Sequence, residues 1–341
     1  MLKSANYIRA GYILAFVPPG PIPAAVPESG EEERFAYVNN PDGSVRWFFP
    51  ADSANPLFLE LYQRANWKSR LYHFGINTAF ALGQQHRLLS GTFQFDLKQN
   101  KLALLAKEMG CSQYAVFTGT AGADRKSVVA LGDDGKARYF LKIAHTESAL
   151  ALVQNERKAL ETLSDISIPG LFVPKHYPND YTHMLAMDNA KPENAGQATE
   201  LRKIHADVLQ GLWATGRSTT LAEMPLWHKT GQAIESLQNP ANRSEALNAI
   251  LPKDFVNRLA TLFASTDTTA DIRVSLAHGD FTPWNMYTSP QGLHVFDWER
   301  SDELPAFFDA FHFIYQSEIL LRRRGAKGIR AAVKALPALF G

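Results

Sequence analysis

Short runs of β-branched and aromatic residues, separated by turn sequences, dominate the first half of the chain. Residues 39–43 (Asn-Asn-Pro-Asp-Gly) and 133–135 (Asp-Asp-Gly) are hairpin turns of the kind that join antiparallel strands. The composition and length of the runs predict β-strands. The predicted strands cover residues 34–38, 45–49, 114–117, 128–131, 138–144 and 183–187.

Apolar residues return every three to four positions over residues 96–109 and 148–163, which predicts two helices. Asp96 is expected to cap the first helix and Gly110 to end it. The second half of the chain is predicted to be mainly helical, with the segment 188–197, rich in Asn, Pro and Gly, as the boundary. The helices expected there cover residues 198–213, 225–237, 244–249, 253–263 and 307–324.

Composition is that of an ordinary globular protein of about two domains. The 341 residues are 45% apolar and 20% charged, and the net charge of +1 gives no field that would recruit nucleic acid or an anionic membrane. No apolar run approaches the roughly 20 residues that span a bilayer. Prolines at 18, 19 and 21 interrupt the short apolar run 12–17 that imitates a signal peptide. The single cysteine, Cys111, fits a reducing compartment, so a cytoplasmic location is expected.

The polar groups with the clearest chemical pattern lie in residues 278–299, HGDFTPWNMYTSPQGLHVFDWE. A hairpin ending in a buried strand would place Asn285 and Asp297 side by side, and their amide and carboxylate oxygens suit Mg²⁺ held by nucleotide phosphates. The separate carboxylate of Asp280 is suited to orient a hydroxyl or accept its proton. The alternative is purely structural, with a turn-forming aspartate, a capping asparagine and an aspartate that ends a strand by chance.

Residues before this stretch include a lysine and two glycines of the kinds that bind phosphate. Lys142 lies within an apolar strand, which is costly unless its ammonium has a partner. Glu156, on the predicted helix 148–163, is the candidate partner; the alternative is an edge-strand lysine that reaches solvent. Gly119 and Gly122 lie in a turn of small residues, where backbone N–H groups are able to approach phosphate closely.

The pair of motifs H-x-D-x-x-x-x-N (His278–Asn285) and D-W-E (Asp297–Glu299) resembles the catalytic core of the aminoglycoside phosphotransferase and choline kinase family, relatives of the protein kinases. The resemblance implies an α+β, bilobal, protein-kinase-like fold. A small antiparallel-sheet N-lobe would cover residues 101–190, and a mostly helical C-lobe with the catalytic loop would cover 191–341. Residues 1–100, which the resemblance does not reach, would form an extra N-terminal module packed on the small lobe.

The resemblance also implies the chemistry. ATP or GTP would bind with Mg²⁺, and the γ-phosphoryl group would move to a hydroxyl of a small molecule. The segment Asp297-Trp298-Glu299 stands in place of the protein-kinase D-F-G motif and lacks its glycine, which favours a small-molecule kinase. The roles carried over are catalysis by Asp280, metal binding by Asn285 and Asp297, nucleotide binding by Gly119, Gly122, Lys142 and Glu156, and structural support by His278 and Asp309.

The sequence is compatible with several acceptors and with alternative functions. The acceptor is of sugar, aminoglycoside or amino-alcohol type, and the oligomeric state is open. Alternative functions are a nucleotide-binding pseudokinase that serves as an interaction module, and a kinase-like adenylyltransferase. Glu299 is part of an acidic rim or an ordinary exposed carboxylate. His205 is interpreted as a packed helix histidine, and residues 322–324 (Arg-Arg-Arg) as a solvated helix end or, alternatively, a contact for an anionic substrate.

Overall fold

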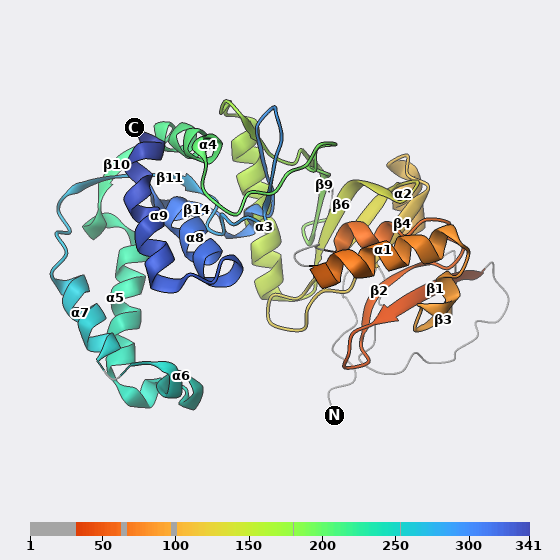
Figure 1. Ribbon diagram of the computed structural model, residues 1–341, viewed down its shortest axis with the longest axis horizontal. Helices are drawn as coiled ribbons and strands as arrows, with labels where there is room; N and C mark the ends of the chain where they lie inside the picture. Colours follow the sequence, from red (N-terminus) through yellow and green to blue (C-terminus); the bar gives the residue numbers. More distant parts are fainter. Residues whose placement is uncertain (1–31, 63–66, 97–100, 180, 253) are drawn as a thin grey trace. The chain divides into compact units, whose positions relative to one another are not determined.

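The computed structural model describes residues 32–62, 67–96, 101–179, 181–252 and 254–341 (Figure 1). Backbone contacts divide the chain into two units. Within the described residues, unit 1 holds Leu171–Gln197, Trp284–Arg300 and the chain up to Ser167, and unit 2 holds Ile168–Gly170, Ala198–Pro283 and Ser301–Gly341. Most strands lie in unit 1 and most helices in unit 2, so the expected α+β fold class is confirmed.

Unit 1 is built on an eight-stranded sheet with the order β3-β1-β2-β4-β5-β6-β9-β8. Every neighbouring pair is antiparallel, as the hairpin turns in the sequence indicate. The strands are β1 (Glu32–Asn39), β2 (Val45–Pro50), β3 (Gly91–Asp96), β4 (Gln113–Phe117), β5 (Lys126–Asp133), β6 (Lys136–Ala144), β8 (His176–Tyr177) and β9 (Met184–Asp188).

The strands before residue 100 continue the same sheet as those after it. The link is the pairing of β2 with β4, with Trp47 opposite Phe117 and Phe48 opposite Val116. Asp96, the expected start of a helix, is the last residue of β3, which pairs with β1; α2 is described over Lys101–Glu108, and residues 97–100, where the cap would act, lie outside the described residues. The proposed division into an N-terminal module and two lobes stays a prediction.

Apolar side chains cover both faces of this sheet because successive strand residues point to opposite sides. On β5, Val129 and Leu131 join a core that includes Leu102 of α2. Ala130, between them, joins a second core with Phe58 and Phe80. These two phenylalanines belong to the 3₁₀-helix η1 (Leu57–Leu61) and to α1 (Trp67–Ala81), which is drawn beside the strands in Figure 1.

The remaining elements of unit 1 include those that carry predicted site residues. Helix α3 (Glu147–Ser164) begins after Thr146, whose side chain accepts a hydrogen bond from the Ala149 N–H at 3.1 Å. The expected hairpin in the 278–299 stretch is present and forms a small sheet, β12-β13-β7. The elements are β7 (Leu171–Phe172), β12 (Met286–Thr288), β13 (Leu293–Val295) and the 3₁₀-helices η2 (Gln85–Arg87) and η6 (Trp298–Arg300).

Unit 2 combines helices with a three-stranded sheet, β10-β11-β14. No helix in the described part of the chain has the length and apolarity that crossing a bilayer requires. The elements are α4 (Lys203–Ala214), β10 (Arg217–Thr220), η4 (Leu221–Glu223), α5 (Pro225–Gln238), η5 (Pro240–Asn242), α6 (Glu245–Ile250), α7 (Phe255–Ala264), β11 (Asp271–Ala277), β14 (Asp302–Pro305), α8 (Phe308–Gln316), the π-helix η7 (Ser317–Leu321) and α9 (Gly325–Phe340).

Two details of unit 2 differ from expectation. Helix α4 starts at Lys203, five residues later than predicted, because Arg202 is its N-cap and donates its backbone N–H to His205 Nδ1 at 3.0 Å. His205 itself is fully buried, so its interpretation as a packed histidine is confirmed. Arg322 ends η7 and Arg324 is exposed, but both do more than end a helix in solvent, since they donate to the buried Glu318 carboxylate at 3.0 and 2.6 Å.

Candidate active site

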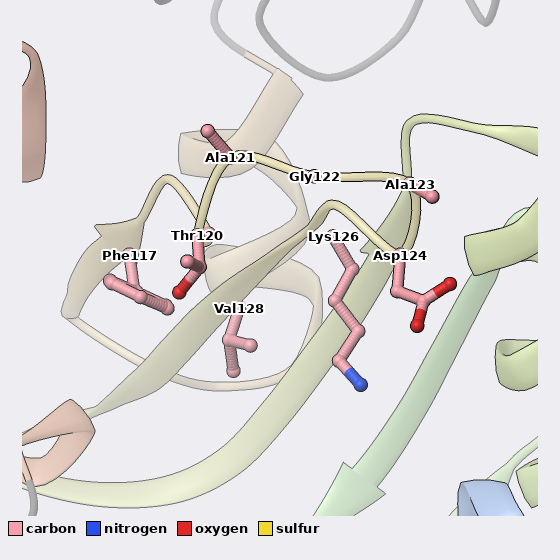
Figure 2. Close-up of a pocket in the computed structure, with 9 residues that line it drawn as sticks. Phe117, Thr120, Ala121, Gly122, Ala123, Asp124, Lys126 and Val128 are labelled. Atoms are coloured by element: carbon pink, nitrogen blue, oxygen red, sulfur yellow. The ribbon is translucent and has the colours of Figure 1, made fainter. Parts of the chain in front are cut away.

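The loop of residues 118–125, here called the glycine loop, joins β4 to β5 and borders a pocket of about 370 Å³ (Figure 2). Gly119 has φ of 80°, and a Cβ there would lie 2.1 Å from the carbonyl oxygen of Lys126, so only glycine fits. The loop is anchored at its far end, where the Thr146 hydroxyl donates to the Ala123 carbonyl. Gly119 and Gly122 both line the pocket, as do Thr120 to Asp124 between and beside them.

The strands below the loop present one face to this pocket. Val128 of β5 lies opposite Phe117 of β4 and opposite Lys142 of β6. Residues paired directly across an antiparallel sheet point to the same side, and so do residues two apart on one strand. Phe117, Lys126, Val128 and Lys142 therefore share a face of the sheet, and the first three line the pocket (Figure 2).

Lys142 is held between two carboxylates. Its ammonium donates to Glu156 Oε2 at 2.6 Å and to Asp297 Oδ1. Only 9% of Lys142 is exposed, and Glu156 is completely buried. Burial by itself disfavours the charged lysine, but Asp297 and Glu156 outweigh it and raise the Lys142 pKa above its usual value. Burial raises the pKa of Glu156, and Lys142 opposes that shift.

The hairpin brings Asn285 and Asp297 to one end of the small sheet. The Phe296 N–H donates to the Asn285 carbonyl at 3.0 Å, directly before Asp297. Asp297 has φ of 69°, a left-handed conformation that costs a non-glycine residue roughly 1–3 kcal/mol and is typical of functional sites. The fully buried Trp298, whose indole N–H donates to the Val295 carbonyl at 3.0 Å, fixes the chain after Asp297.

Two charged residues that sequence reasoning did not assign complete this cluster. Lys126 forms an ion pair with Glu299 Oε2, and Lys142 Nζ lies 3.9 Å from the same oxygen. The carboxylate oxygens of Glu156, Asp297 and Glu299 lie within 4.8 Å of one another. Glu299 is therefore neither a rim residue nor an ordinary exposed carboxylate. The sequence pattern that could have identified Lys126 is its position two residues before Val128. Residues two apart on a strand point to the same side, so Lys126 lies on the sheet face that carries Lys142.

The first part of the H-x-D-x-x-x-x-N motif, residues 278–283, lies in unit 2, at the end of β11. Asp309, at the start of α8 and 3% exposed, accepts hydrogen bonds from the backbone N–H of His278 at 2.7 Å and of Gly279 at 3.0 Å. Gly279 has φ of 77°, which suits glycine. The Asp280 N–H donates to His278 Nδ1 at 3.2 Å. Burial raises the pKa of the Asp309 carboxyl, and His278 opposes that rise.

His312 is a further residue that the sequence did not single out. Its Nε2 lies 3.0 Å from Asp280 Oδ1, at hydrogen-bond distance. It follows Asp309 by three positions on α8, and residues three apart share a helix face. That spacing was the available signal: a helix whose aspartate reaches the catalytic loop also presents the residue one turn later.

The predicted site residues therefore fall into two groups. Unit 1 brings together Lys142, Glu156 and Asp297, with Asn285 at the neighbouring hairpin end and the two glycines at the pocket. Unit 2 brings together His278, Asp280 and Asp309. The boundary between the units falls at Pro283–Trp284, within the motif.

The match to a protein family agrees with the motif. The sequence model of the phosphotransferase enzyme family matches residues 120–336, which include every residue of both groups except Gly119. No curated protein matches the chain. Similar solved structures include a macrolide 2'-phosphotransferase from Brachybacterium faecium (14% identity, TM-score 0.47, 70% of this chain and 83% of that one) and a choline kinase from Streptococcus pneumoniae (16%, 0.38, 66% and 84%). A third is an aminoglycoside phosphotransferase from Streptomyces rimosus in complex with ADP and streptomycin (17%, 0.44, 70% and 90%).

The family match spans well over half of the chain and runs from the glycine loop to the last helix. It covers the buried lysine–carboxylate cluster of unit 1 and the aspartate-braced loop of unit 2. As the resemblance implied, the chain belongs to the phosphotransferase enzyme family and is a kinase-like transferase.

Proposed function

We propose that this protein transfers the γ-phosphoryl group of ATP or GTP, with Mg²⁺, to a hydroxyl group of a small molecule of sugar, aminoglycoside or amino-alcohol type. The observation that carries the proposal is Lys142, a buried ammonium held by Glu156 and Asp297 on the sheet face that lines the glycine-loop pocket. Such a charge, fixed in place beside a backbone loop, suits the phosphate chain of a nucleotide.

The residues present fit a magnesium ion. The candidate donor set consists of hard oxygens, which Mg²⁺ prefers: the Asp297 carboxylate beside Lys142 and the amide of Asn285 at the neighbouring hairpin end. Glu156 Oε1 is buried and has no hydrogen-bond partner within the described residues, so the cluster retains unused acceptor capacity. Asn285 and Asp297 would hold the ion, which when bound neutralises phosphate charge.

The chain's own groups would then do the following. Lys142 binds phosphate oxygens, and the N–H groups of the glycine loop approach the same chain of phosphates. Asp280 accepts a hydrogen bond from the acceptor hydroxyl and orients its oxygen toward the γ-phosphorus. A new oxygen–phosphorus bond forms while the bond to the β–γ bridging oxygen breaks, and the hydroxyl proton passes to Asp280.

A small-molecule acceptor is supported by the segment after Asp297. Protein kinases have a mobile D-F-G segment there that takes part in regulation. Here Trp298 is fully buried and hydrogen-bonded to the chain before it, so the segment is part of the core of unit 1. Nothing in the charge of the chain favours a nucleic-acid partner.

The test is a screen of sugars, aminoglycosides and amino alcohols with Mg²⁺ and either ATP or GTP, read by nucleoside-diphosphate release and by the mass of the acceptor. We expect one acceptor class to gain one phosphoryl group. A gain of an adenylyl group would show an adenylyltransferase instead. Tight nucleotide binding without any turnover across the panel would show an interaction module, and phosphorylation confined to protein side chains would exclude the small-molecule acceptor.

A further inference from the structure

A second lysine, Lys126, shares the sheet face of Lys142, lines the glycine-loop pocket itself and has no role in the proposed function as stated so far. We propose that Lys126 is a second phosphate-binding cation of the nucleotide site, which exchanges its ion pair with Glu299 for oxygens of the triphosphate chain. The inference rests on the proposed function for the identity of the ligand, a nucleoside triphosphate with Mg²⁺.

The position of Lys126 is set by strand register. It is the first residue of β5, directly after the glycine loop, and lies opposite Ala144, whereas Val128 lies opposite Lys142. The two lysines are therefore diagonal neighbours on one face, and side chains in that relation are separated by about 7–8 Å at the backbone, within reach of long side chains. Figure 2 shows the Lys126 side chain extending from the strand below the loop, on the same side as Asp124.

The ammonium groups of the two lysines converge. Glu299 Oε2 is paired with Lys126 and lies 3.9 Å from Lys142 Nζ, so one carboxylate oxygen serves both cations. The Lys126 side chain is only 19% exposed. Burial and the nearby Lys142 lower the pKa of Lys126 below its usual value, so an anion close to both ammonium groups is favourable.

The charge balance of the cluster fits a polyphosphate. Lys126 and Lys142 face the three carboxylates of Glu156, Asp297 and Glu299. The cluster alone has one excess negative charge, and one divalent cation makes it net positive. Without Lys126, the same cluster with the same ion would be neutral. Lys126 thus supplies the positive charge that a triphosphate chain requires.

A purely structural role for the Lys126–Glu299 pair would be to tie the glycine loop to η6. Other contacts already make that connection. Arg300 of η6 forms an ion pair with Asp124 of the loop at 3.5 Å. Helix α3 links the two as well: its Ser148 hydroxyl donates to Asp124, and its Asn155 donates to the Glu299 carbonyl at 3.0 Å. The loop and η6 remain connected when Lys126 changes partner, so its ammonium is available to a phosphate.

The experiment compares Lys126→Met and Lys126→Arg with Lys136→Met, which changes an exposed lysine at the far end of β6. Binding of Mg²⁺–ATP, Mg²⁺–GTP and the corresponding nucleosides is measured by titration calorimetry. Loss of one charge-assisted contact predicts that Lys126→Met binds the triphosphate roughly tenfold to a hundredfold more weakly, with unchanged nucleoside binding. Lys126→Arg should restore most of the affinity, and Lys136→Met should match the wild type.

Each outcome decides the matter. Equal triphosphate affinity for wild type and Lys126→Met overturns the inference and leaves the proposed function intact. An equal loss for triphosphate and nucleoside also overturns it, because it would show a disturbed pocket rather than a lost phosphate contact. Wild-type protein that binds neither nucleotide overturns the proposed function, and the inference with it.

Discussion

The candidate residues of unit 1 are charged side chains that contact one another directly. In unit 2, by contrast, the loop that carries Asp280 is held by hydrogen bonds between its backbone and the Asp309 carboxylate. Lys142 contacts two carboxylates directly, and both are tied to it by charge. In unit 2, Asp309 accepts the N–H groups of His278 and Gly279 and thereby shapes the loop that presents Asp280.

Because of this difference, we expect mutations in unit 1 to change nucleotide and metal affinity, and a mutation of Asp280 in unit 2 to change turnover. Removing Glu156 or Asp297 takes a close carboxylate partner from the buried Lys142, so metal affinity and nucleotide affinity change together. The Asp280 side chain is 29% exposed, and the loop backbone is held by other groups. A change at Asp280 should therefore affect turnover alone.

The largest expected effect is that of Asp280→Asn. The variant keeps the shape of the side chain but loses the basicity, and general-base contributions are roughly 10²–10⁴-fold in turnover. Mg²⁺–nucleotide binding, measured by calorimetry, should be unchanged. Near-normal turnover would identify Asp280 as a structural turn residue and remove the main support for the catalytic assignment.

Asp297→Ala tests the other side of the comparison. It removes a proposed metal ligand and one of the two carboxylates that contact Lys142. Even outer-shell metal partners typically contribute 10–100-fold to affinity, so Mg²⁺–nucleotide binding should weaken by at least about that factor. Turnover at low nucleotide concentration should fall in parallel. A variant that bound Mg²⁺–nucleotide normally would show that the ion is held elsewhere.

Much of the fold could be predicted because its signals are local. The alternation around Lys142 and the helical spacing around Glu156 depend on neighbouring residues alone, and the structure has a strand and a helix there. Strand β3 was missed because its pairing partner, β1, lies more than fifty residues away. Helix α9 was missed because Gly325, Gly328 and Pro337 interrupt its sequence.

Prediction of the candidate site was likewise restricted to residues that lie close together in the sequence. Motif spacing pointed to Asp280, Asn285 and Asp297, since they lie within one short stretch. Lys126 and His312 could not be identified in this way, because each is recognised by its contact with a residue on another element. The partner of Lys126 is Glu299, and that of His312 is Asp280. Such pairings depend on strand register and helix phase across the fold, which local patterns do not determine.

The third prediction concerns how the stability of the fold depends on pH, and it compares one histidine from each unit. Burial lowers the pKa of His205 in unit 2 to about 4, from its usual value near 6.5. Below pH 6.5 the unfolded chain takes up a proton that the folded chain does not, so stability falls as the pH drops from about 6.5 to 4. For such a shift the free energy of unfolding should decrease by about 2 kcal/mol between pH 7.5 and 5.

His205→Gln provides the check on that prediction, because glutamine retains an acceptor but does not titrate. Urea unfolding at pH 7.5 and pH 5 should show a smaller acid loss in this variant than in the wild type. Exposed His86→Gln is the matched control and should leave the acid loss unchanged. Unit 1 contains a similar group, since burial and Arg125 lower the pKa of His145 to about 4. An acid loss that persists fully in His205→Gln would assign the effect to other groups.

The smallest expected effect is that of His312, whose contact with Asp280 lies within unit 2. A hydrogen bond to a carboxylate contributes roughly 1.5 kcal/mol or more, so His312→Ala should lower kcat about tenfold by letting the Asp280 carboxylate rotate. His312→Gln places an amide N–H at about the reach of Nε2 and should recover most of the loss, whereas a residue needed only for packing would not be rescued in this way. The dissociation constant for Mg²⁺–nucleotide should stay at the wild-type value in both variants, since His312 makes its contact in unit 2. If His312→Ala weakened nucleotide binding as much as turnover, the functional separation of the two units would be wrong.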